Sequence, residues 1–361
     1  MTAQNEVRLA LPGKGALEAA TLNFLAECGM KVNRSNPRQY LAGIKSMPGV
    51  EVVFQRAADI PLLVQDGDAA LGITGYDILA EHRGYGDEDD EEEDSDDEMI
   101  ILERDLGYGH CRLVVAVPET WIDVSACADL WHLAGYYMTQ KGRALRIATK
   151  YPALTGKFLR GQGITHYKLI SPHGALEAAP LTDTADLIVD LTETGTTLRE
   201  NHLKLLDDGE VLRSQACLIG NVRLLEQHEA ALRIASLMLE LIEARMQARN
   251  RSLLTAYMQS ESVEYIQRVC NDLRASISGI EFRRSGADEQ QVTPEDTREA
   301  RNWYTITGVV SVGSSSADLL EAVAALRGAG AVHINVIPLT LRFQHESASV
   351  RALRKRLKRR Q

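Results

Sequence analysis

The 361-residue sequence has few cysteines, few aromatic residues and no long apolar run. Its five cysteines are odd in number and widely scattered, and no two form a CxxC pair, so the pattern favours neither a disulfide framework nor a zinc site. No segment approaches about 18 uninterrupted apolar residues, and no basic flank precedes an apolar stretch near residue 1. We therefore expect a soluble, cytoplasmic protein with no membrane partner.

The net charge of −10 is unevenly distributed along the chain. Residues 87–98 carry eleven acids and one serine, residues 351–361 carry seven basic side chains, and the remainder has 39 acids and 33 bases. Because a dense block of like charges cannot bury apolar surface, we expect 87–98 to be a disordered insert and 346–361 a solvated basic tail. The alternative is that the two segments meet across subunits. The tail has no aromatic residues to stack on bases, which argues against a nucleic-acid partner.

Strand-like and helix-like segments alternate in two successive series. The first series has strands at 7–12, 50–55 and 69–74, and the second has strands at 145–149, 166–170 and 186–191. Such alternation is typical of parallel α/β lobes. The apolar runs 111–118 and 211–221 join the two series, and we expect them to lie antiparallel as hinge strands of a two-lobed clamp with its ligand cleft between the lobes.

The pattern predicts three domains and a tail. Residues 1–110 with 220–249 form the first lobe, in which 222–249 is expected to be one long helix, and 111–219 form the second lobe. Residues 250–345 follow the order βαββαβ, which predicts a ferredoxin-like regulatory domain.

The most informative stretch is 186–201, where an apolar strand ends at Asp190 and is followed by a Thr-Gly-Thr-Thr loop. A strand that stops at such a turn and restarts as a helix gathers backbone N–H groups and hydroxyls where the helix dipole favours negative charge. Asp190 could accept hydrogen bonds from sugar hydroxyls or face a hydrated Mg²⁺. The loop is neither a Walker A motif nor a GxGxxG turn. It predicts a sugar-phosphate cradle, with a plain turn capped by Thr197 as the alternative.

Five segments in the same order resemble the long form of the ATP phosphoribosyltransferases, which join ATP to phosphoribosyl pyrophosphate in the first step of histidine biosynthesis. The segments are 11–17, 71–79, 106–118, 146–152 and 177–198, and the resemblance runs over about residues 6–340. It implies an α/β fold with a two-lobed core like the type II periplasmic-binding proteins and a C-terminal ferredoxin-like domain. The family tends to have glycine where Asp183 stands, which predicts a looser turn before the strand.

The resemblance also implies roles for individual residues. It places phosphoribosyl pyrophosphate on one loop: Asp190, Thr192, Glu193, Thr194, Gly195, Thr196 and Thr197. It places ATP or pyrophosphate near a second set: Lys14, Asp77, Cys111, Arg112, Thr149, Tyr151 and Glu177. Mg²⁺ is the implied cofactor, with Asp77 or Asp190 as its candidate ligand. Simpler interpretations remain for Lys14 as an exposed turn residue, Asp77 as a helix cap and Cys111 as a packed side chain.

The implied chemistry requires little acid–base catalysis, because N1 of adenine already carries a lone pair and pyrophosphate is the leaving group. No catalytic acid or base is assigned, and the histidines near the motifs are isolated. The resemblance further implies inhibition by L-histidine and a homo-oligomer built from dimers, up to a hexamer. The segment 280–303 is longer and more charged than is usual in the family, and Arg283 and Arg284 could change which effector fits.

Three other classes compete with this interpretation. A solute-binding protein would share the hinge but would need a signal peptide and no phosphate cradle. A salvage phosphoribosyltransferase would show two adjacent acids before its loop, whereas Leu191 follows Asp190 here. A catalytically silent regulatory protein that binds nucleotides or sugar phosphates on the same scaffold also fits the residues.

Overall fold

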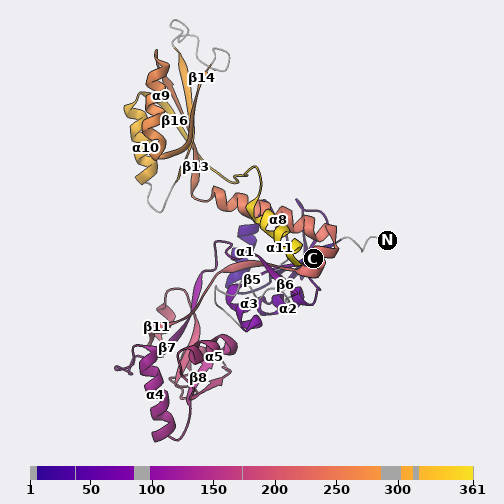
Figure 1. Cartoon of the computed structure of the whole chain (residues 1–361), viewed down its shortest axis with the longest axis vertical. Helices are drawn as coiled ribbons and strands as arrows, with labels where there is room; N and C mark the ends of the chain where they lie inside the picture. Colours follow the sequence, from indigo (N-terminus) through magenta and orange to yellow (C-terminus); the bar gives the residue numbers. More distant parts are fainter. Residues whose placement is uncertain are drawn as a thin grey trace. The chain divides into compact units, whose positions relative to one another are not determined.

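The computed structural model describes residues 6–36, 38–84, 98–172, 174–285, 302–311 and 317–360 (Figure 1). The acidic segment, apart from Glu98, and most of the charged segment 280–303 lie outside the described residues. The chain divides into two compact units, residues 1–240 with 346–361 and residues 241–345. Among the described helices, none is both long and apolar enough to cross a membrane.

The first lobe is built on a seven-stranded sheet of order β2-β3-β4-β1-β5-β12-β6. Its strands are β1 (Val7–Pro12), β2 (Val32–Asn33), β3 (Leu41–Ile44), β4 (Val50–Gln55), β5 (Leu71–Gly75), β6 (Met99–Glu103) and β12 (Ala216–Asn221). Its helices are α1 (Ala16–Glu27), η1 (Ala57–Asp59), α2 (Ile60–Gln65) and α3 (Tyr76–Arg83). Strand β1 runs parallel to β4 and β5, and β5 is buried along its whole length, as expected for a parallel strand covered on both faces.

The second lobe is built on a five-stranded sheet of order β11-β7-β10-β8-β9. Its strands are β7 (Cys111–Pro118), β8 (Leu145–Thr149), β9 (Tyr167–Ile170), β10 (Leu187–Thr192) and β11 (Leu203–Ser214). Its helices are α4 (Cys127–Gln140), α5 (Pro152–Gly161), η2 (Leu176–Ala178) and α6 (Thr196–Glu200). Strand β8 runs parallel to β9 and β10, whereas β7 runs antiparallel to β10 and β11.

Both sheets repeat one topology. The strands β4-β1-β5-β12-β6 of the first lobe correspond in order to β9-β8-β10-β7-β11 of the second. In each list the fourth strand runs antiparallel to the third: β12 to β5 in the first lobe, and β7 to β10 in the second. Each of these two strands directly follows a passage of the chain between the lobes. This is the two-lobed plan of type II periplasmic-binding proteins, so the predicted fold of the core is confirmed.

The predicted hinge strands pair as expected over part of their length. Cys111 lies opposite Ser214 in the antiparallel pair of β7 and β11. Beyond Gln215 the chain enters the other sheet, where β12 pairs with β5 and β6. The second lobe therefore ends at Ser214 rather than at residue 219, because residues 216–221 take their hydrogen bonds from the first lobe.

The helix expected over 222–249 is divided in two. Helix α7 (Val222–Gln227) is capped by Asn221, whose side chain accepts a hydrogen bond from Leu224 N, and α8 (Glu229–Ala248) begins after His228. His228 has extended backbone angles, φ −116° and ψ 104°. The apolar spacing is helical on both sides of this residue, which is why the sequence did not reveal the break.

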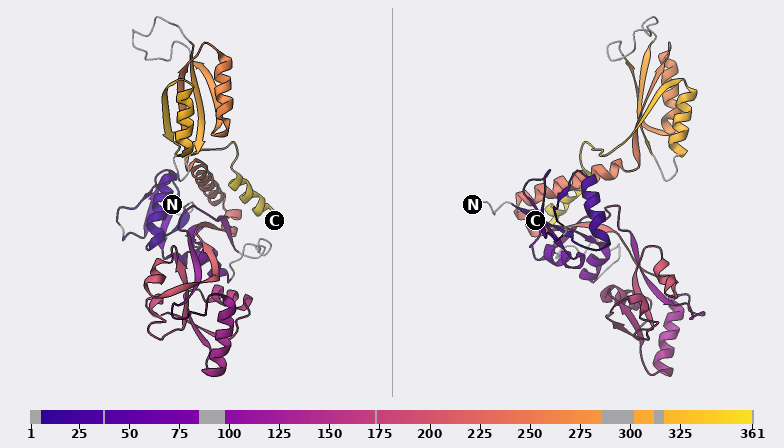
Figure 2. Two further views of the ribbon diagram at one scale, coloured as in Figure 1. Left: turned by 90° about the vertical axis from the view of Figure 1, so that its left-hand side faces the viewer. Right: turned by 180° about the vertical axis from the view of Figure 1, so that it is seen from behind.

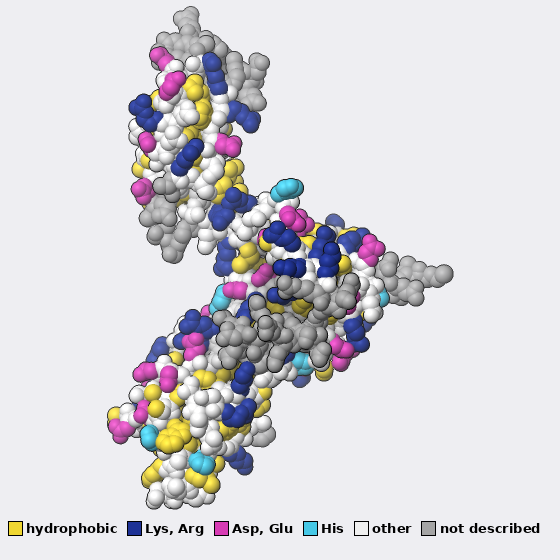
Figure 3. All heavy atoms as spheres, in the orientation of Figure 1, with side chains coloured by type: hydrophobic (Ala, Val, Ile, Leu, Met, Phe, Trp, Pro, Cys, Tyr) yellow, Lys and Arg dark blue, Asp and Glu magenta, His cyan; other side chains and the backbone are white. Residues whose placement is uncertain are grey.

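The basic C-terminal segment is a packed helix, so the prediction of a solvated tail is wrong. Helix α11 (Ala348–Arg360) buries Leu353 and Leu357, which lie four residues apart on one face. Arg356 Nη1 donates a 2.8 Å hydrogen bond to the carbonyl oxygen of Ile101 on β6. Most of the basic side chains on the helix remain exposed, and Figure 3 shows Lys and Arg side chains gathered on this part of the first unit.

The second unit is a four-stranded antiparallel sheet of order β14-β15-β13-β16. Its elements are β13 (Arg251–Gln259), α9 (Val263–Asp272), η3 (Leu273–Ala275), β14 (Ile277–Ser285), β15 (Trp303–Ser311), α10 (Ala317–Gly328) and β16 (Ala331–Pro338). Burial alternates along β13, where Leu254, Ala256 and Met258 face the core. Helices α9 and α10 cover the same face of the sheet (Figures 1 and 2). The predicted ferredoxin-like fold is confirmed.

Candidate functional site

A cavity of about 460 Å³ lies between the two lobes of the first unit. Its lining residues are Ala16, Leu17, Gly75, Asp77, Ile78, Gly109, His110, Cys111, Tyr151, Leu191, Thr192 and Glu193. Many of them follow the carboxyl ends of parallel strands, which is where open α/β sheets bind ligands. The cavity brings together five residues predicted from the sequence: Asp77, Cys111, Tyr151, Thr192 and Glu193.

Asp77, in the lining of this cavity, connects the two lobes. It lies in the first turn of α3, directly after β5, and only 4% of it is exposed. Its Oδ1 accepts a 2.6 Å hydrogen bond from Ser214 Oγ, and its Oδ2 accepts a 2.6 Å hydrogen bond from the Tyr151 hydroxyl. A Cβ atom on Gly75 would collide with Asp77 Oδ1, so glycine at this position leaves room for the carboxylate. Ser214 was not predicted as a site residue.

The two titratable donors beside Asp77 stay protonated at neutral pH. Burial, followed by the charge of Asp77, raises the pKa of the Tyr151 hydroxyl well above its ordinary value. Burial and the same charge raise the pKa of the Cys111 thiol to about 11. The cavity therefore offers neutral hydrogen-bonding groups at these positions, and neither a thiolate nor a phenolate is ready as a base or nucleophile.

The Thr-rich loop joins β10 to α6 at one wall of the cavity. Gly195 has a left-handed φ of 75°, and its N–H donates a 2.8 Å hydrogen bond to Thr192 Oγ1. Thr194 and Thr196 bond each other through their hydroxyls at 2.9 Å, and both residues are exposed. Arg199 Nη2 donates to Thr196 Oγ1 at 3.2 Å, which adds a cation beside the loop that sequence reasoning had not selected.

Asp190 sits just before the loop with two charged neighbours. It is half-buried, and Leu191 N donates a 2.8 Å hydrogen bond to its Oδ1. Burial raises the pKa of the Asp190 carboxyl and the charge of Glu177 adds to this, whereas the Leu191 N–H and Lys150 act in the opposite direction. Lys150 was also missed, although it follows β8 directly at the same edge of the sheet as Asp190.

The other nine predicted residues lie outside the cavity lining, among them Thr149, Arg112 and Lys14. Thr149 is buried, and its Oγ1 accepts a 2.9 Å hydrogen bond from Tyr151 N, so it shapes the turn that carries Tyr151. Arg112 pairs with Glu210 on the neighbouring strand at 3.1 Å. Lys14 is exposed in the turn before α1, two residues from Ala16 in the lining.

The turn before β10 is tied down by arginines rather than loosened by Asp183. Asp183 has a left-handed φ of 54°, which explains why glycine suits this position, and Arg146 bonds both its carbonyl oxygen at 2.7 Å and its carboxylate at 2.5 Å. Asp186 accepts a bidentate pair from Arg143 at 2.6 and 2.8 Å. Burial alone would raise the pKa of the Asp186 carboxyl, but the hydrogen bonds from Arg143 and Arg146 outweigh it and hold that pKa well below its ordinary value.

The carboxylates differ in how well they could hold a divalent cation. In the part of the chain that the structure describes, no group of three His, Cys, Asp or Glu side chains is arranged as a metal site. Both oxygens of Asp77 already accept hydrogen bonds from protein hydroxyls. Asp190 has Glu177 as a charged neighbour. Because Mg²⁺ commonly takes one or two carboxylates together with substrate phosphates, Asp190 fits it better than Asp77.

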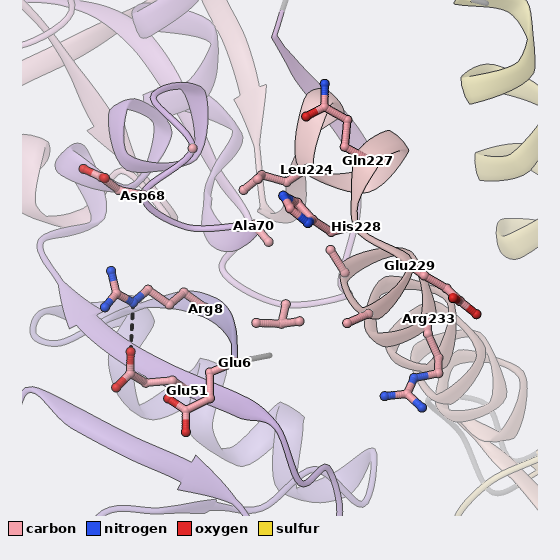
Figure 4. A pocket seen from close by; sticks show the side chains of 14 residues that line it. Glu6, Arg8, Glu51, Asp68, Ala70, Leu224, Gln227, His228, Glu229 and Arg233 are labelled. Carbon is pink, nitrogen blue, oxygen red and sulfur yellow. Dashed lines mark hydrogen bonds and ion pairs between the residues drawn. The ribbon is translucent and has the colours of Figure 1, made fainter. Parts of the chain in front are cut away.

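A second hollow, of about 750 Å³, lies on the first lobe near the amino ends of β1 and β4 (Figure 4). Its labelled side chains are mostly charged or polar, and Arg8 and Glu51 pair across one side of it at 2.8 Å. His228 and Glu229, at the break between α7 and α8, form part of another side. None of the site residues predicted from the sequence lines this hollow.

The sequence matches known proteins along most of its length. A family model described as HisG, ATP phosphoribosyltransferase, matches residues 56–244. The chain is 36% identical over 346 residues to ATP phosphoribosyltransferase 2, chloroplastic, of Arabidopsis thaliana, an alignment covering 95% of this chain and 79% of that relative. It is 45% identical over 215 residues to ATP phosphoribosyltransferase of Chelativorans sp. (strain BNC1), covering 59% of this chain and 89% of that relative.

Two solved structures illustrate the structural comparison. A chain of the ATP phosphoribosyl transferase (HisG:HisZ) complex from Thermotoga maritima is 26% identical with a TM-score of 0.48, and the match covers 66% of this chain and 98% of that chain. The substrate binding protein of an amino acid ABC transporter is 11% identical with a TM-score of 0.38, covering 67% of this chain and 93% of that chain. Each match covers about two thirds of this chain.

Proposed function

The chain belongs to the ATP phosphoribosyltransferase family, and we propose that ATP and phosphoribosyl pyrophosphate meet in the cavity between its lobes. The enzyme transfers the phosphoribosyl group to N1 of ATP and releases pyrophosphate, which is the first step of L-histidine biosynthesis. One observation carries the site assignment. Asp77 and Tyr151, from facing lobes, line the same cavity as Thr192 and Glu193, where the predicted phosphate loop begins.

The reaction depends on alignment more than on proton transfer. The bond between the anomeric carbon and pyrophosphate breaks as adenine N1 bonds to that carbon, and positive charge develops on the sugar ring. A site that orients both substrates and offers groups to the leaving pyrophosphate lowers this barrier without a general base. The neutral state of Cys111 and Tyr151 near pH 7 is consistent with such a mechanism.

We assign the 5′-phosphate of phosphoribosyl pyrophosphate to the loop from Thr192 to Thr197. The exposed hydroxyls of Thr194, Thr196 and Thr197, together with nearby Arg199, support this assignment. The left-handed turn at Gly195 lets the backbone enter α6 directly after the loop. Asp190 then accepts hydrogen bonds from the ribose hydroxyls, which is a role suited to a half-buried carboxylate at the end of a strand.

We assign ATP to the side of the cavity formed by the first lobe. Leu17 and Ile78 offer apolar surface there for a base, and the exposed Lys14 lies just before α1 as a cation for the triphosphate. Asp77 orients the substrate through the same carboxylate that accepts from Tyr151. Thr149 holds the backbone of Tyr151 by accepting a hydrogen bond from its N–H. Arg112 would reach a phosphate only after breaking its ion pair with Glu210.

Mg²⁺ is the divalent cation that we propose for this reaction. Asp190, with Glu177 beside it, would hold the ion together with the substrate's own phosphate oxygens. When bound, the ion would neutralise negative charge on the pyrophosphate. Asp190 itself keeps the ribose of phosphoribosyl pyrophosphate at the carboxyl end of β10.

For the second unit we propose inhibition by L-histidine and assembly of dimers into a hexamer. The helices of the ferredoxin-like module cover one face of its sheet, which suits a regulatory or assembly role. Arg283 is exposed on β14. Arg284 on the same strand donates a hydrogen bond to the side chain of Asn302, which lies just before β15.

We also propose that the protein works in the cytoplasm. Four of the five cysteines are buried and the sequence has no CxxC pair, as suits a reducing compartment. The Arabidopsis relatives are named chloroplastic, so the cytoplasmic location is a proposal specific to this chain.

Release of pyrophosphate from ATP, phosphoribosyl pyrophosphate and Mg²⁺ tests the proposed function. We expect release by the wild-type protein, a loss of about a hundredfold or more in Asp190→Asn, and inhibition when millimolar histidine is added. Omission of Mg²⁺ serves as the control for the metal. No release from the folded protein across salt and pH would favour the catalytically silent alternative, and activity indifferent to histidine would contradict the regulatory proposal alone.

A further inference from the structure

Glu81 connects the lobes at a second point, one turn beyond Asp77 on α3. Its Oε1 accepts a 2.8 Å hydrogen bond from Ala153 N, and its Oε2 accepts a 3.0 Å hydrogen bond from Leu154 N. Ala153 and Leu154 are the second and third residues of α5 in the other lobe. Residues four apart on a helix lie on one face, so Asp77 and Glu81 both face the second lobe.

Helix α5 has no cap of its own. The residue at its N-cap position, Tyr151, makes no side-chain capping hydrogen bond, and its hydroxyl is bonded instead to Asp77. Pro152 at the first helical position has no N–H, so the first donors of the helix are those of Ala153 and Leu154. Glu81 takes both, which means that α5 is capped by a side chain from the opposite lobe.

We propose that Glu81 is a positioning residue that latches the two lobes in the arrangement where Tyr151 meets Asp77. The contact between Asp77 and Ser214 lies at the end of β11, beside the hinge, where it changes little as the lobes move. The bonds from Glu81 to α5 and from Tyr151 to Asp77 lie on helices that separate when the cleft opens. These two contacts therefore favour the closed state.

The latch also directs substrate phosphates, an inference that rests on the proposed function. A helix N-terminus attracts anions because its N–H groups are unpaired and its dipole is positive there. The carboxylate of Glu81 fills that position on α5. The Thr192–Thr197 loop is then left as the anion site of the second lobe that faces the cavity.

Glu81→Ala tests the latch through the separation of KM from kcat. Because substrates can still close the cleft at saturation, we expect KM for both substrates to rise about tenfold and kcat to change less than about twofold. Sodium acetate should restore part of the lost affinity, since a free carboxylate can occupy the N-terminus of α5, and it should leave the wild-type protein unaffected. Glu226→Ala on α7, which removes an exposed glutamate, is the matched control.

A second measurement follows the lobes directly and does not depend on activity. Cysteines introduced at Tyr40 and Ile122, which are 74% and 83% exposed on opposite lobes, carry a fluorescent donor and acceptor. We expect lower transfer efficiency in Glu81→Ala than in the wild-type background, and an intermediate value in Glu81→Gln, which keeps one acceptor oxygen. Unchanged transfer together with unchanged KM in a variant of normal melting temperature would overturn the proposal. An inactive wild-type protein with the expected shift in transfer would instead refute the proposed function alone.

Discussion

Asp186 illustrates how single charged residues hold the second lobe together. Asp186 is 8% exposed, and its carboxylate accepts hydrogen bonds from the side chains of Arg143 and Arg146 and from the backbone N–H of Arg146. Because Arg143 lies just before β8 and Arg146 lies within it, the carboxylate joins that strand to the start of β10. The strand that ends at the phosphate loop is thereby fixed at its beginning.

Asp186→Asn should destabilise the protein in a pH-dependent way. The folded pKa of Asp186 is depressed, so its contribution is fully present above the unfolded pKa, 3.8, and is lost as pH falls through the lower folded pKa. We expect a loss of about 2–4 kcal/mol in the free energy of unfolding at pH 7, shrinking toward zero below about pH 4. Denaturant titrations at several pH values measure it.

Asp183→Asn is the control for this experiment. The Asp183 side chain is 90% exposed, so its ion pair with Arg146 is screened, and asparagine tolerates the left-handed φ. We expect a change below about 1 kcal/mol. Equal losses in both variants would contradict the distinction between the buried and the exposed carboxylate.

At the scale of elements, the sequence predicted what depends on local patterns. Strand β10, the loop after it and the order of the second unit follow from apolar runs and turn residues, and they are found where expected. The break at His228 and the packing of α11 depend on which surfaces meet, which no local pattern encodes. The capping of α5 by Glu81 likewise joins residues 72 positions apart in sequence, so only the folded chain reveals it.

Leu357→Ala tests whether α11 is part of the first unit. Leu357 is 6% exposed, so its truncation should leave a cavity against the lobe and lower the free energy of unfolding by about 2–4 kcal/mol. Arg354→Ala, on the exposed face of the same helix, should change it by less than about 0.5 kcal/mol. Denaturant unfolding of both variants decides between a packed helix and a solvated tail. If the segment were a solvated tail, the two substitutions would have equally small effects.

At the scale of the whole first unit, two sheets of one topology bring the ends of their parallel strands to a shared cavity. The sequence predicted five of the lining residues because each lies at the end of a strand, or just beyond it, in a recognisable segment. It missed Ser214, Lys150 and Glu81 because their roles arise from contacts between lobes or from charge at a distance. Our central claim is that the Thr-rich loop is the phosphate-binding wall of this cavity.

Calorimetric titration of phosphoribosyl pyrophosphate with Mg²⁺ tests that claim most directly. The double variant Thr196→Ala/Thr197→Ala removes two exposed hydroxyls of the loop, and Thr139→Ala removes one from α4 as the control. We predict that the double variant binds phosphoribosyl pyrophosphate at least about tenfold more weakly while the control matches the wild-type protein. Wild-type affinity in a correctly folded double variant would contradict the account.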